Sequence, residues 1–161
     1  MITKEEFSKL MTIELDMLQK QTSGLSHADS LLQPQPGGNC LNWIMGHLLV
    51  NLVDILNVLG AGPPAVQPDL SHYGYGSEPV RCDAPGVIEL QDLVETYALL
   101  TNAITDQLTL MTAADFDEVI DFWQGKSRRG YVAFFYFFHN PYHIGQLEQL
   151  RHLAGRTEKV I

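Results

Sequence analysis

The chain has 161 residues, a formal net charge of −9 at pH 7 and 45% hydrophobic residues. This length and composition predict one domain with a sizeable core, and the acidic balance argues against binding of nucleic acid or of an anionic membrane surface. The first residues lack the apolar stretch of a signal peptide, and Asn51, Asp54 and Asn57 interrupt the most apolar run, so we expect no membrane span.

The first predicted helix runs from about Thr3 to Gln21, with its apolar residues on one stripe. Thr3 followed by Glu6 matches a capping box, which predicts the first turn. Glu14 falls within the apolar stripe. We expect its carboxylate to lie at the edge of that stripe and to reach solvent; a role as an acid or base near a metal is the alternative.

The second predicted helix runs from about Leu41 to Leu59, after a break at Gln33–Gly38 that is rich in proline and glycine. Asn39 or Asn42 is the expected N-cap, because asparagine side chains accept hydrogen bonds from the first free N–H groups of a helix.

A narrow polar stripe accompanies this second helix. His47, Asn51 and Asp54 follow one another at i, i+4 and i+7 and therefore share one face. Asn51 and Asp54 are candidate catalytic residues, Asn51 through hydrogen bonds beside a metal and Asp54 as a general base. The alternative is a partly exposed helix face with no part in chemistry.

The segment from Ala61 to Pro85 is rich in Gly, Pro, Tyr and Ser and has no regular period. A connection this long in a small domain is either functional or a crossover between distant helix ends. His72, Tyr73 and Tyr75 lie in it, and they either close over a substrate or pack down on the domain. The third helix is expected over about Gly86–Met111.

Residues 112–126 are predicted to be irregular, with a short strand-like piece around Val119-Ile120. The last helix is expected over about Ser127–Ala154. Pro141 lies within it and removes one backbone hydrogen bond, but the apolar pattern continues in phase across the proline, which favours one kinked helix. The alternative is a new helix with Asn140 as its cap and Pro141 at its first position.

The tryptophans and cysteines give weaker signals. Trp43 and Trp123 are expected in the core. Cys40 and Cys82 form no Cys-x-x-Cys motif and fit unpaired thiols in a reducing cytoplasm. We interpret both cysteines as incidental to any chemistry.

Three histidines form the most informative pattern. His139 and His143 are one helical turn apart in the most apolar helix, so both rings can point at one spot, and His47 is the third candidate ligand. Three protein ligands leave open positions on a transition metal, which is typical of catalytic sites. Gln146, one turn further on, could hydrogen-bond a ligand or join two helices. The alternative is that the histidines are ordinary core residues with satisfied hydrogen bonds.

Three short motifs carry a family resemblance: Trp43-x-x-x-His47-Leu48, His139-x-x-x-His143-x-Gly145-Gln146-Leu147, and Leu150-Arg151 followed by Gly155. With them the chain resembles the DinB-like superfamily over essentially its whole length. This group of small metal-binding four-helix proteins includes thiol-dependent S-transferases. The resemblance implies an all-α four-helix bundle with a long connection between helices 2 and 3.

The resemblance also implies that His47, His139 and His143 ligate a divalent metal, usually zinc or nickel, at one end of the bundle, and that the protein forms homodimers. Such a metal would activate water or a low-molecular-weight thiol, so we expect a cytoplasmic hydrolase or S-transferase acting on a small molecule, with Asp54, Gln146 and Asn51 as catalytic residues. One alternative is a binding or dimerisation protein in which the metal only holds the helices together. Another is a metal-free helical dimerisation domain.

Overall fold

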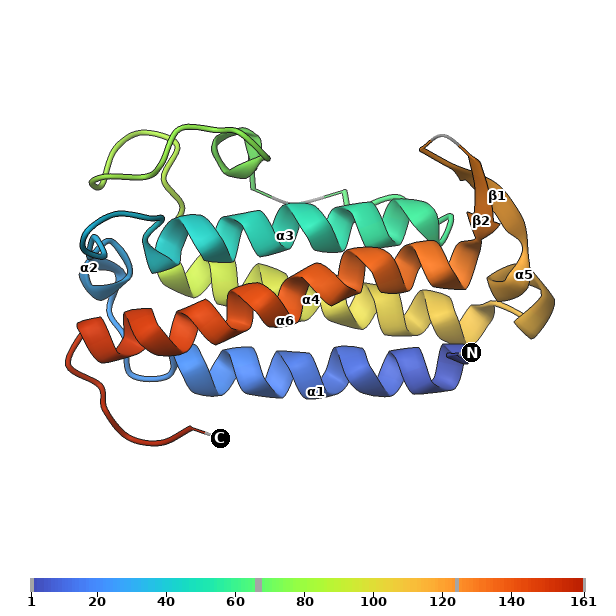
Figure 1. Cartoon of the computed structure of the whole chain (residues 1–161), viewed down its shortest axis with the longest axis horizontal. Helices are drawn as coiled ribbons and strands as arrows, with labels where there is room; N and C mark the ends of the chain where they lie inside the picture. Colours follow the sequence, from blue (N-terminus) through green and yellow to red (C-terminus); the bar gives the residue numbers. More distant parts are fainter. Residues whose placement is uncertain (1, 66–67, 124, 161) are drawn as a thin grey trace.

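Four long helices make up the body of the computed structural model, which describes residues 2–65, 68–123 and 125–160 (Figure 1). Each of the four long predicted helices is present, and the all-α class is confirmed. In chain order the long helices are α1 (Lys4–Thr22), α3 (Leu41–Val58), α4 (Leu90–Leu110) and α6 (Arg129–Leu153). The shorter elements are α2 (His27–Ser30), the 3₁₀ turn η1 (Ser71–Tyr73), α5 (Ala113–Asp117), β1 (Val119–Phe122) and β2 (Gly125–Arg128).

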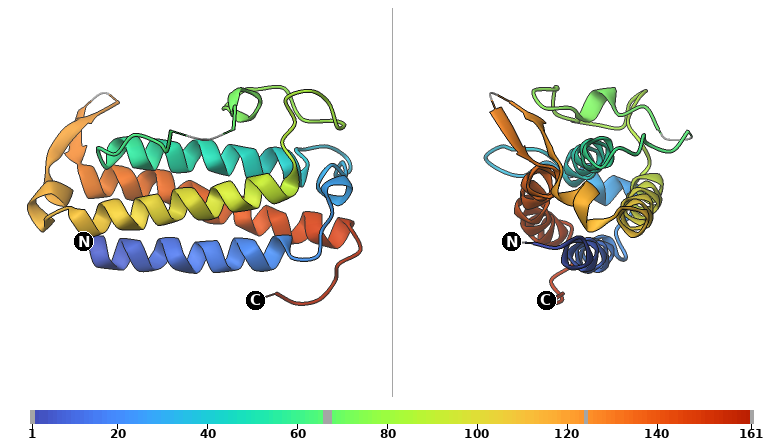
Figure 2. Two further views of the ribbon diagram at one scale, coloured as in Figure 1. Left: turned by 180° about the vertical axis from the view of Figure 1, so that it is seen from behind. Right: turned by 90° about the vertical axis from the view of Figure 1, so that its right-hand side faces the viewer.

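The long helices are arranged so that α1 and α3 each pack against both α4 and α6, as the end-on view in Figure 2 shows. The core between them consists of side chains such as Phe7, Leu48, Leu52 and Ile104, which are fully buried. α3 is the most apolar of the four long helices, so the expectation that His139 and His143 lie in the most apolar helix is wrong. α3 is also long and apolar enough to cross a membrane. Because 67% of that window is buried inside the bundle, α3 is the core helix of a folded domain.

Helix starts differ in their capping: α1, α2 and α5 begin with capping boxes, whereas α3, α4 and α6 have no side-chain cap. The predicted box at Thr3 and Glu6 is formed, with both reciprocal hydrogen bonds present. The predicted cap of α3 is wrong, because Cys40 occupies the N-cap position and no side chain caps this end. Asn42 is instead buried, and it donates to the carbonyl of Ile88, 2.8 Å away.

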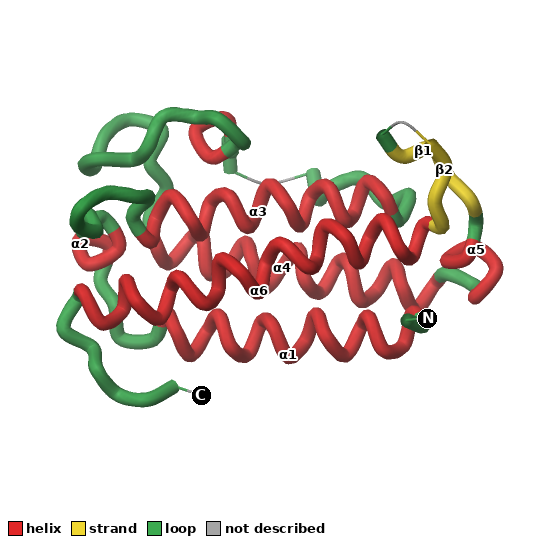
Figure 3. The backbone as a smooth tube through the Cα atoms, in the orientation of Figure 1, coloured by secondary structure: helices red, strands yellow, loops and turns green. Residues whose placement is uncertain are grey.

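The chain between residues 112 and 126 is more regular than predicted. The box formed by Thr112 and Asp115 starts α5. The strand-like piece around Val119-Ile120 is confirmed as β1, and it pairs with β2 in an antiparallel hairpin. Figure 3 shows this hairpin beside the end of the bundle where α6 begins.

α6 runs without interruption through Pro141. The alternative of a new helix that starts at this proline is therefore wrong. Asn140 does not act as a cap, because it lies fully buried in the middle of α6 and its side chain bonds to Glu14 and Asn51.

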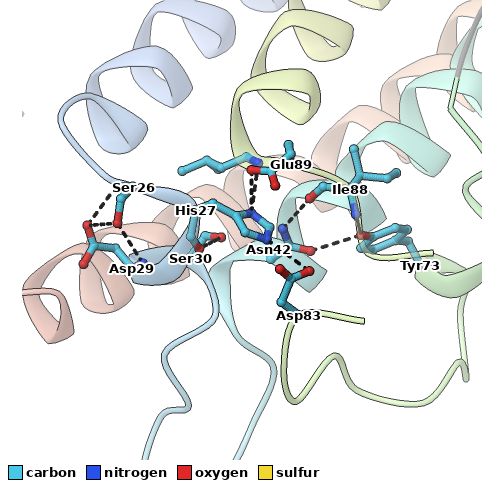
Figure 4. Close-up of polar contacts among 10 residues, drawn as sticks. Ser26, His27, Asp29, Ser30, Asn42, Tyr73, Asp83, Ile88 and Glu89 are labelled. Atoms are coloured by element: carbon cyan, nitrogen blue, oxygen red, sulfur yellow. Dashed lines mark hydrogen bonds and ion pairs between the residues drawn. The ribbon is translucent and has the colours of Figure 1, made fainter. Parts of the chain in front are cut away.

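The connection between α3 and α4 lies along the outer side of α3 (Figure 1). Its anchor is Tyr73, which is fully buried; its hydroxyl donates to Asn42 Oδ1 (3.0 Å) and accepts from the backbone N–H of Ile88 (2.9 Å) (Figure 4). The Tyr73 ring lies directly against Gly46, where a Cβ would overlap the ring. Of the two outcomes considered for the loop aromatics, Tyr73 packs down, whereas Tyr75 is 99% exposed.

Two predictions about burial are wrong. Glu14 does not reach solvent: its side chain is buried and accepts hydrogen bonds from the Tyr97 hydroxyl and from Asn140. Trp123 is not a core residue, since it is 78% exposed, whereas Trp43 is buried as expected. The error at Glu14 arises because a stripe of apolar residues shows which face is buried but not which polar partners meet there, and Trp123 is exposed because it lies in the turn between β1 and β2.

Candidate metal centre

Three histidine rings from two helices converge. His47 comes from α3, and His139 and His143 come from adjacent turns of α6. The Nε2 atom of His139 lies 3.1 Å from Nε2 of His47 and 2.9 Å from Nε2 of His143, and the potential ligand atoms of all three lie within 4.8 Å of one another. Two nitrogens bound to one tetrahedral zinc are roughly 3.3 Å apart, given Zn–N distances of about 2.0–2.1 Å. The ring spacing therefore suits a single cation.

The cluster lies partway along the bundle. His47 is the seventh residue of α3, and His139 is the eleventh of α6. The expected position at one end of the bundle is therefore wrong. The two helices pack side by side at this level, so the site lies on a long side of the bundle.

In His47 and His143, the hydrogen-bond partner of Nδ1 determines which of the two ring nitrogens carries the proton. His47 Nδ1 is 2.9 Å from the carbonyl oxygen of Tyr73, and His143 Nδ1 is 2.7 Å from Oε1 of Gln146. Because both oxygens can only accept, both Nδ1 atoms carry hydrogen in the neutral rings, and each Nε2 carries a free lone pair. These lone pairs point at His139 Nε2, so a cation between the three nitrogens would satisfy them.

Burial favours the neutral form of two of the rings, His139 and His143. It lowers the pKa of His143 to about 4, against a smaller opposing effect of the Gln146 hydrogen bond. Burial also lowers the pKa of His139, and His47 adds to that effect. At pH 7 the neutral form that a metal requires is therefore the stable form of both residues.

Trp43 adds a further restraint on His47. Its indole ring stacks on the imidazole with the centroids 4.8 Å apart and the planes 16° apart. The indole N–H in turn donates to Ser77 Oγ at 3.0 Å, in the α3–α4 connection. The orientation of His47 is thus determined by an aromatic neighbour on its own helix and by the carbonyl of Tyr73.

Two cavities flank the histidines. One, of about 630 Å³, lies between α3, α6 and the hairpin. The other, of about 510 Å³, lies between α6 and the segment around Gly37 and Gly38. His47 and His139 border both, and His143 borders the second. A cation held by the three rings would therefore be accessible to small molecules.

The three predicted catalytic residues lie near this centre in different ways. Gln146 contacts the ring of His143 rather than a second helix. Asn51 is buried, and it joins α3 to α6 by donating to the Tyr136 carbonyl (2.7 Å) and to Asn140 Oδ1. Asp54 is half-buried and lines the 630 Å³ cavity.

Several residues that shape the site were not expected from the sequence. The carbonyl of Tyr73 and the stacked ring of Trp43 orient His47, and Trp123 lines the larger cavity. The motif Trp43-x-x-x-His47 was a usable signal for the stacking, since residues four apart share a helix face. Nothing in the sequence indicated the backbone contact of Tyr73.

The cysteines take no part in the centre. Cys40 is buried at the start of α3, where its thiol is 3.3 Å from the carbonyl oxygen of Val80, and Cys82 is exposed. Neither forms a disulfide. Any thiol chemistry here would therefore need a thiol from outside the chain.

Comparisons with known proteins agree with this architecture. A family model described as the DinB superfamily matches residues 11–147. No curated protein matches the chain. The crystal structure of a conserved protein of locus from Enterococcus faecalis is similar with a TM-score of 0.74 at 16% sequence identity, over 96% of this chain and 98% of that chain. At that identity the likeness concerns the fold alone.

Proposed function

We propose, from the premise that this chain belongs to the DinB superfamily, that it is a metal-dependent enzyme whose His47, His139 and His143 hold one divalent transition metal, zinc or nickel. The observation that carries the proposal is the convergence of three Nε2 atoms, of which those of His47 and His143 have a lone pair directed at the third. Ordinary core histidines would each be satisfied by a separate partner.

The chemistry we propose is activation of water or of a low-molecular-weight thiol. When bound, a divalent cation supplies Lewis acidity that brings the pKa of such a nucleophile toward about 7. The Tyr73 carbonyl and Gln146 hold the Nδ1 protons of His47 and His143, and so keep both rings oriented. Asn51 supports the site by fixing α3 against α6. Hydrolysis and S-transfer both fit this arrangement, because no Ser, Thr or Cys is among the described residues that line the two cavities.

The first test is the metal content of protein purified without added metal. We expect close to one equivalent in the wild type and less than a tenth in His47→Ala and His143→Ala. His152→Ala is the matched control, because His152 is exposed near the end of α6 and should leave the metal content unchanged. Titration of stripped protein with Ni²⁺ should also quench Trp43 fluorescence, since this ring stacks on His47.

Either of two results would contradict the proposal: a wild type without metal, or a variant lacking His47 that binds metal with unchanged affinity. A bound metal that raises thermal stability, without turnover of any thiol or ester substrate, would favour a non-catalytic role. That alternative has a structural basis, because the three ligands come from two helices and a metal would also join α3 to α6. The homodimer and the cytoplasmic location stay predictions.

A further inference from the structure

The cavity of about 630 Å³ beside His47 and His139 has walls of distinctive chemistry. Its volume is in the range of sites that bind small organic molecules. α3 and α6 form its floor, and two segments outside the four long helices, the β1–β2 turn and the α3–α4 connection, add to its sides. Six aromatic side chains line it: Tyr75, Trp123, Phe135, Tyr136, Phe138 and Tyr142.

Several of these aromatic side chains are largely exposed to solvent, although burial would stabilise the folded protein more. Trp123 and Phe138 are 78% and 71% exposed, and Tyr75 is 99% exposed. Large exposed aromatic groups gathered around one concavity mark a binding surface, because each leaves apolar area in contact with water until a ligand covers it.

The backbone conformation of Trp123 and its two aromatic neighbours fix the position of its indole ring. Trp123 has a φ of 49°, a left-handed conformation that is rare for a bulky residue. Its ring stacks on Phe122 with a centroid distance of 4.8 Å and meets Phe135 edge-on at 5.0 Å. A positive φ is what a two-residue hairpin turn requires of its first residue, and here that turn places an indole ring in the cavity wall.

One charged group faces this aromatic cavity. Among the described residues that line it, Asp54 alone has a formal charge, and no Lys or Arg is present. Asp54 is half-buried, and no hydrogen bond or ion pair within the described ranges reaches its carboxylate. Burial raises the pKa of this group, against a smaller opposing effect of His47. A carboxylate that is partly shielded from water and has no protein partner is a favourable site for a cationic ligand.

The distance between Asp54 and the candidate metal centre sets the length of a ligand that could reach both. Asp54 follows His47 by seven residues on the same helix, which is close to two full turns on the same face. At 1.5 Å per residue their Cα atoms are about 10 Å apart along α3. Because Asp54, His47 and His139 all line the cavity, this separation leaves room for a small molecule that spans from Asp54 to the histidines.

We infer that this cavity binds an aromatic organic cation, with its ammonium group against Asp54, its ring system among the aromatic walls, and its reactive group directed at the histidines. The last part rests on the proposed metal function; the recognition of the cation does not. Aromatic faces attract cations as well as apolar groups, so the walls and the carboxylate favour the same ligand. Asp54 is then a substrate-binding residue rather than the general base expected from the sequence.

The test compares three naphthyl probes by calorimetry at pH 8: a naphthylmethyl-trimethylammonium ion, neutral naphthylmethanol and naphthalenesulfonate. We expect the cation to bind at least tenfold more tightly than the neutral probe, and the anion most weakly. Asp54→Asn should reduce the preference for the cation over the neutral probe to less than threefold. Asp106→Asn is the matched control: it removes an equal charge from the exposed face of α4 and should leave the preference unchanged.

Further variants separate the parts of the inference. Trp123→Ala should weaken binding of the cation and of the neutral probe to a similar degree, because it removes wall area and no charge. His143→Ala should lose the metal under the proposed function and still keep the preference for the cation, since His143 does not line this cavity. If the metal proposal is wrong and the cation inference is right, the wild type should contain no metal and should still prefer the cationic probe over the neutral one.

The inference would be overturned by any of three results. The neutral probe could bind as tightly as the cation, the preference for the cation could survive Asp54→Asn, or Trp123→Ala could leave the affinity for both probes unchanged. Each result would mean that these walls do not recognise the proposed class of ligand.

Discussion

At the scale of single residues, the geometry of the histidine cluster depends on neighbouring groups that would not themselves contact a metal. The backbone carbonyl of Tyr73 determines the tautomer of His47, and the stacked indole of Trp43 determines the orientation of its ring. The ring of Tyr73 can approach α3 only because residue 46 is a glycine. The groups that orient a candidate ligand histidine are therefore expected to affect the affinity for a metal.

Gly46→Ala tests this dependence. The new methyl would overlap the ring of Tyr73, which is fully buried and hydrogen-bonded at its hydroxyl and cannot move freely. We expect a loss of about 3 kcal/mol in the free energy of unfolding and an affinity for Zn²⁺ lower by about 10- to 100-fold, measured by urea denaturation and by competition with a chelator.

Gly145→Ala is the control for that substitution, because it lies on a helix with open space around it and should not lower stability. A Gly46→Ala protein with unchanged metal affinity would show that the Tyr73 carbonyl does not orient His47.

At the scale of elements, the four long helices could be predicted because each has a periodic apolar stripe and a recognisable break at its ends. The short helices α2 and α5 were missed, although each begins with a capping box, at Ser26 and Thr112 respectively. Four or five residues hold too little periodicity to predict a helix. The pairing of the histidines on α6 followed from their spacing, but their meeting with His47 depends on tertiary packing, which only the family resemblance indicated.

Pro141 is unusual because prolines rarely occur inside helices, and it lies within the continuous helix that carries two of the three histidines. Its side chain is exposed, and it cannot donate to the carbonyl of Phe137. Pro141→Ala should restore that hydrogen bond and raise the free energy of unfolding by about 2 kcal/mol, after allowance for the greater freedom of the unfolded chain. Chemical denaturation of the metal-free protein measures this directly.

The gain should exceed that of Gly145→Ala, which improves helix propensity alone by about 1 kcal/mol. A destabilised Pro141→Ala protein would mean that α6 is adapted to the proline around the site.

At the scale of the whole molecule, one polar network joins all four long helices. Glu14 of α1 accepts from Tyr97 of α4 and from Asn140 of α6, which in turn accepts from Asn51 of α3. The sequence placed each of these residues on a helix, yet it could not show that they meet, because a contact between four separate helices leaves no local pattern. Glu14 Oε2 has no partner among the described residues, so burial of a charged carboxylate here is costly.

This network should make stability depend on pH. Burial raises the pKa of Glu14 from 4.5 to about 7, despite its hydrogen bonds to Tyr97 and Asn140. Between these values the folded protein holds the proton more tightly than the unfolded chain, so the free energy of unfolding contributed by Glu14 falls as pH rises. From pH 5 to pH 8 this loss should be about 2–3 kcal/mol.

Glu14→Gln should remove that loss while its amide oxygen still accepts both hydrogen bonds. The difference between the two proteins in urea denaturation from pH 5 to pH 8 isolates Glu14, because the burial that lowers the pKa of His143 acts in both. Glu95→Gln, at an exposed position on α4, is the control. Parallel pH profiles for the wild type and Glu14→Gln would show that Glu14 is ionised in the folded state throughout.

Tyr75 and Trp123 belong to a loop and a hairpin turn, whereas the histidines belong to helices that form the core. Part of the cavity wall is therefore encoded outside the helices that carry the histidines, whereas Asp54 and the other four aromatic side chains belong to α3 and α6. Grafting a different hairpin onto the same four helices would change the ligand that the cavity selects without altering the three histidines, whereas a different α3–α4 connection would also remove the Tyr73 carbonyl that orients His47.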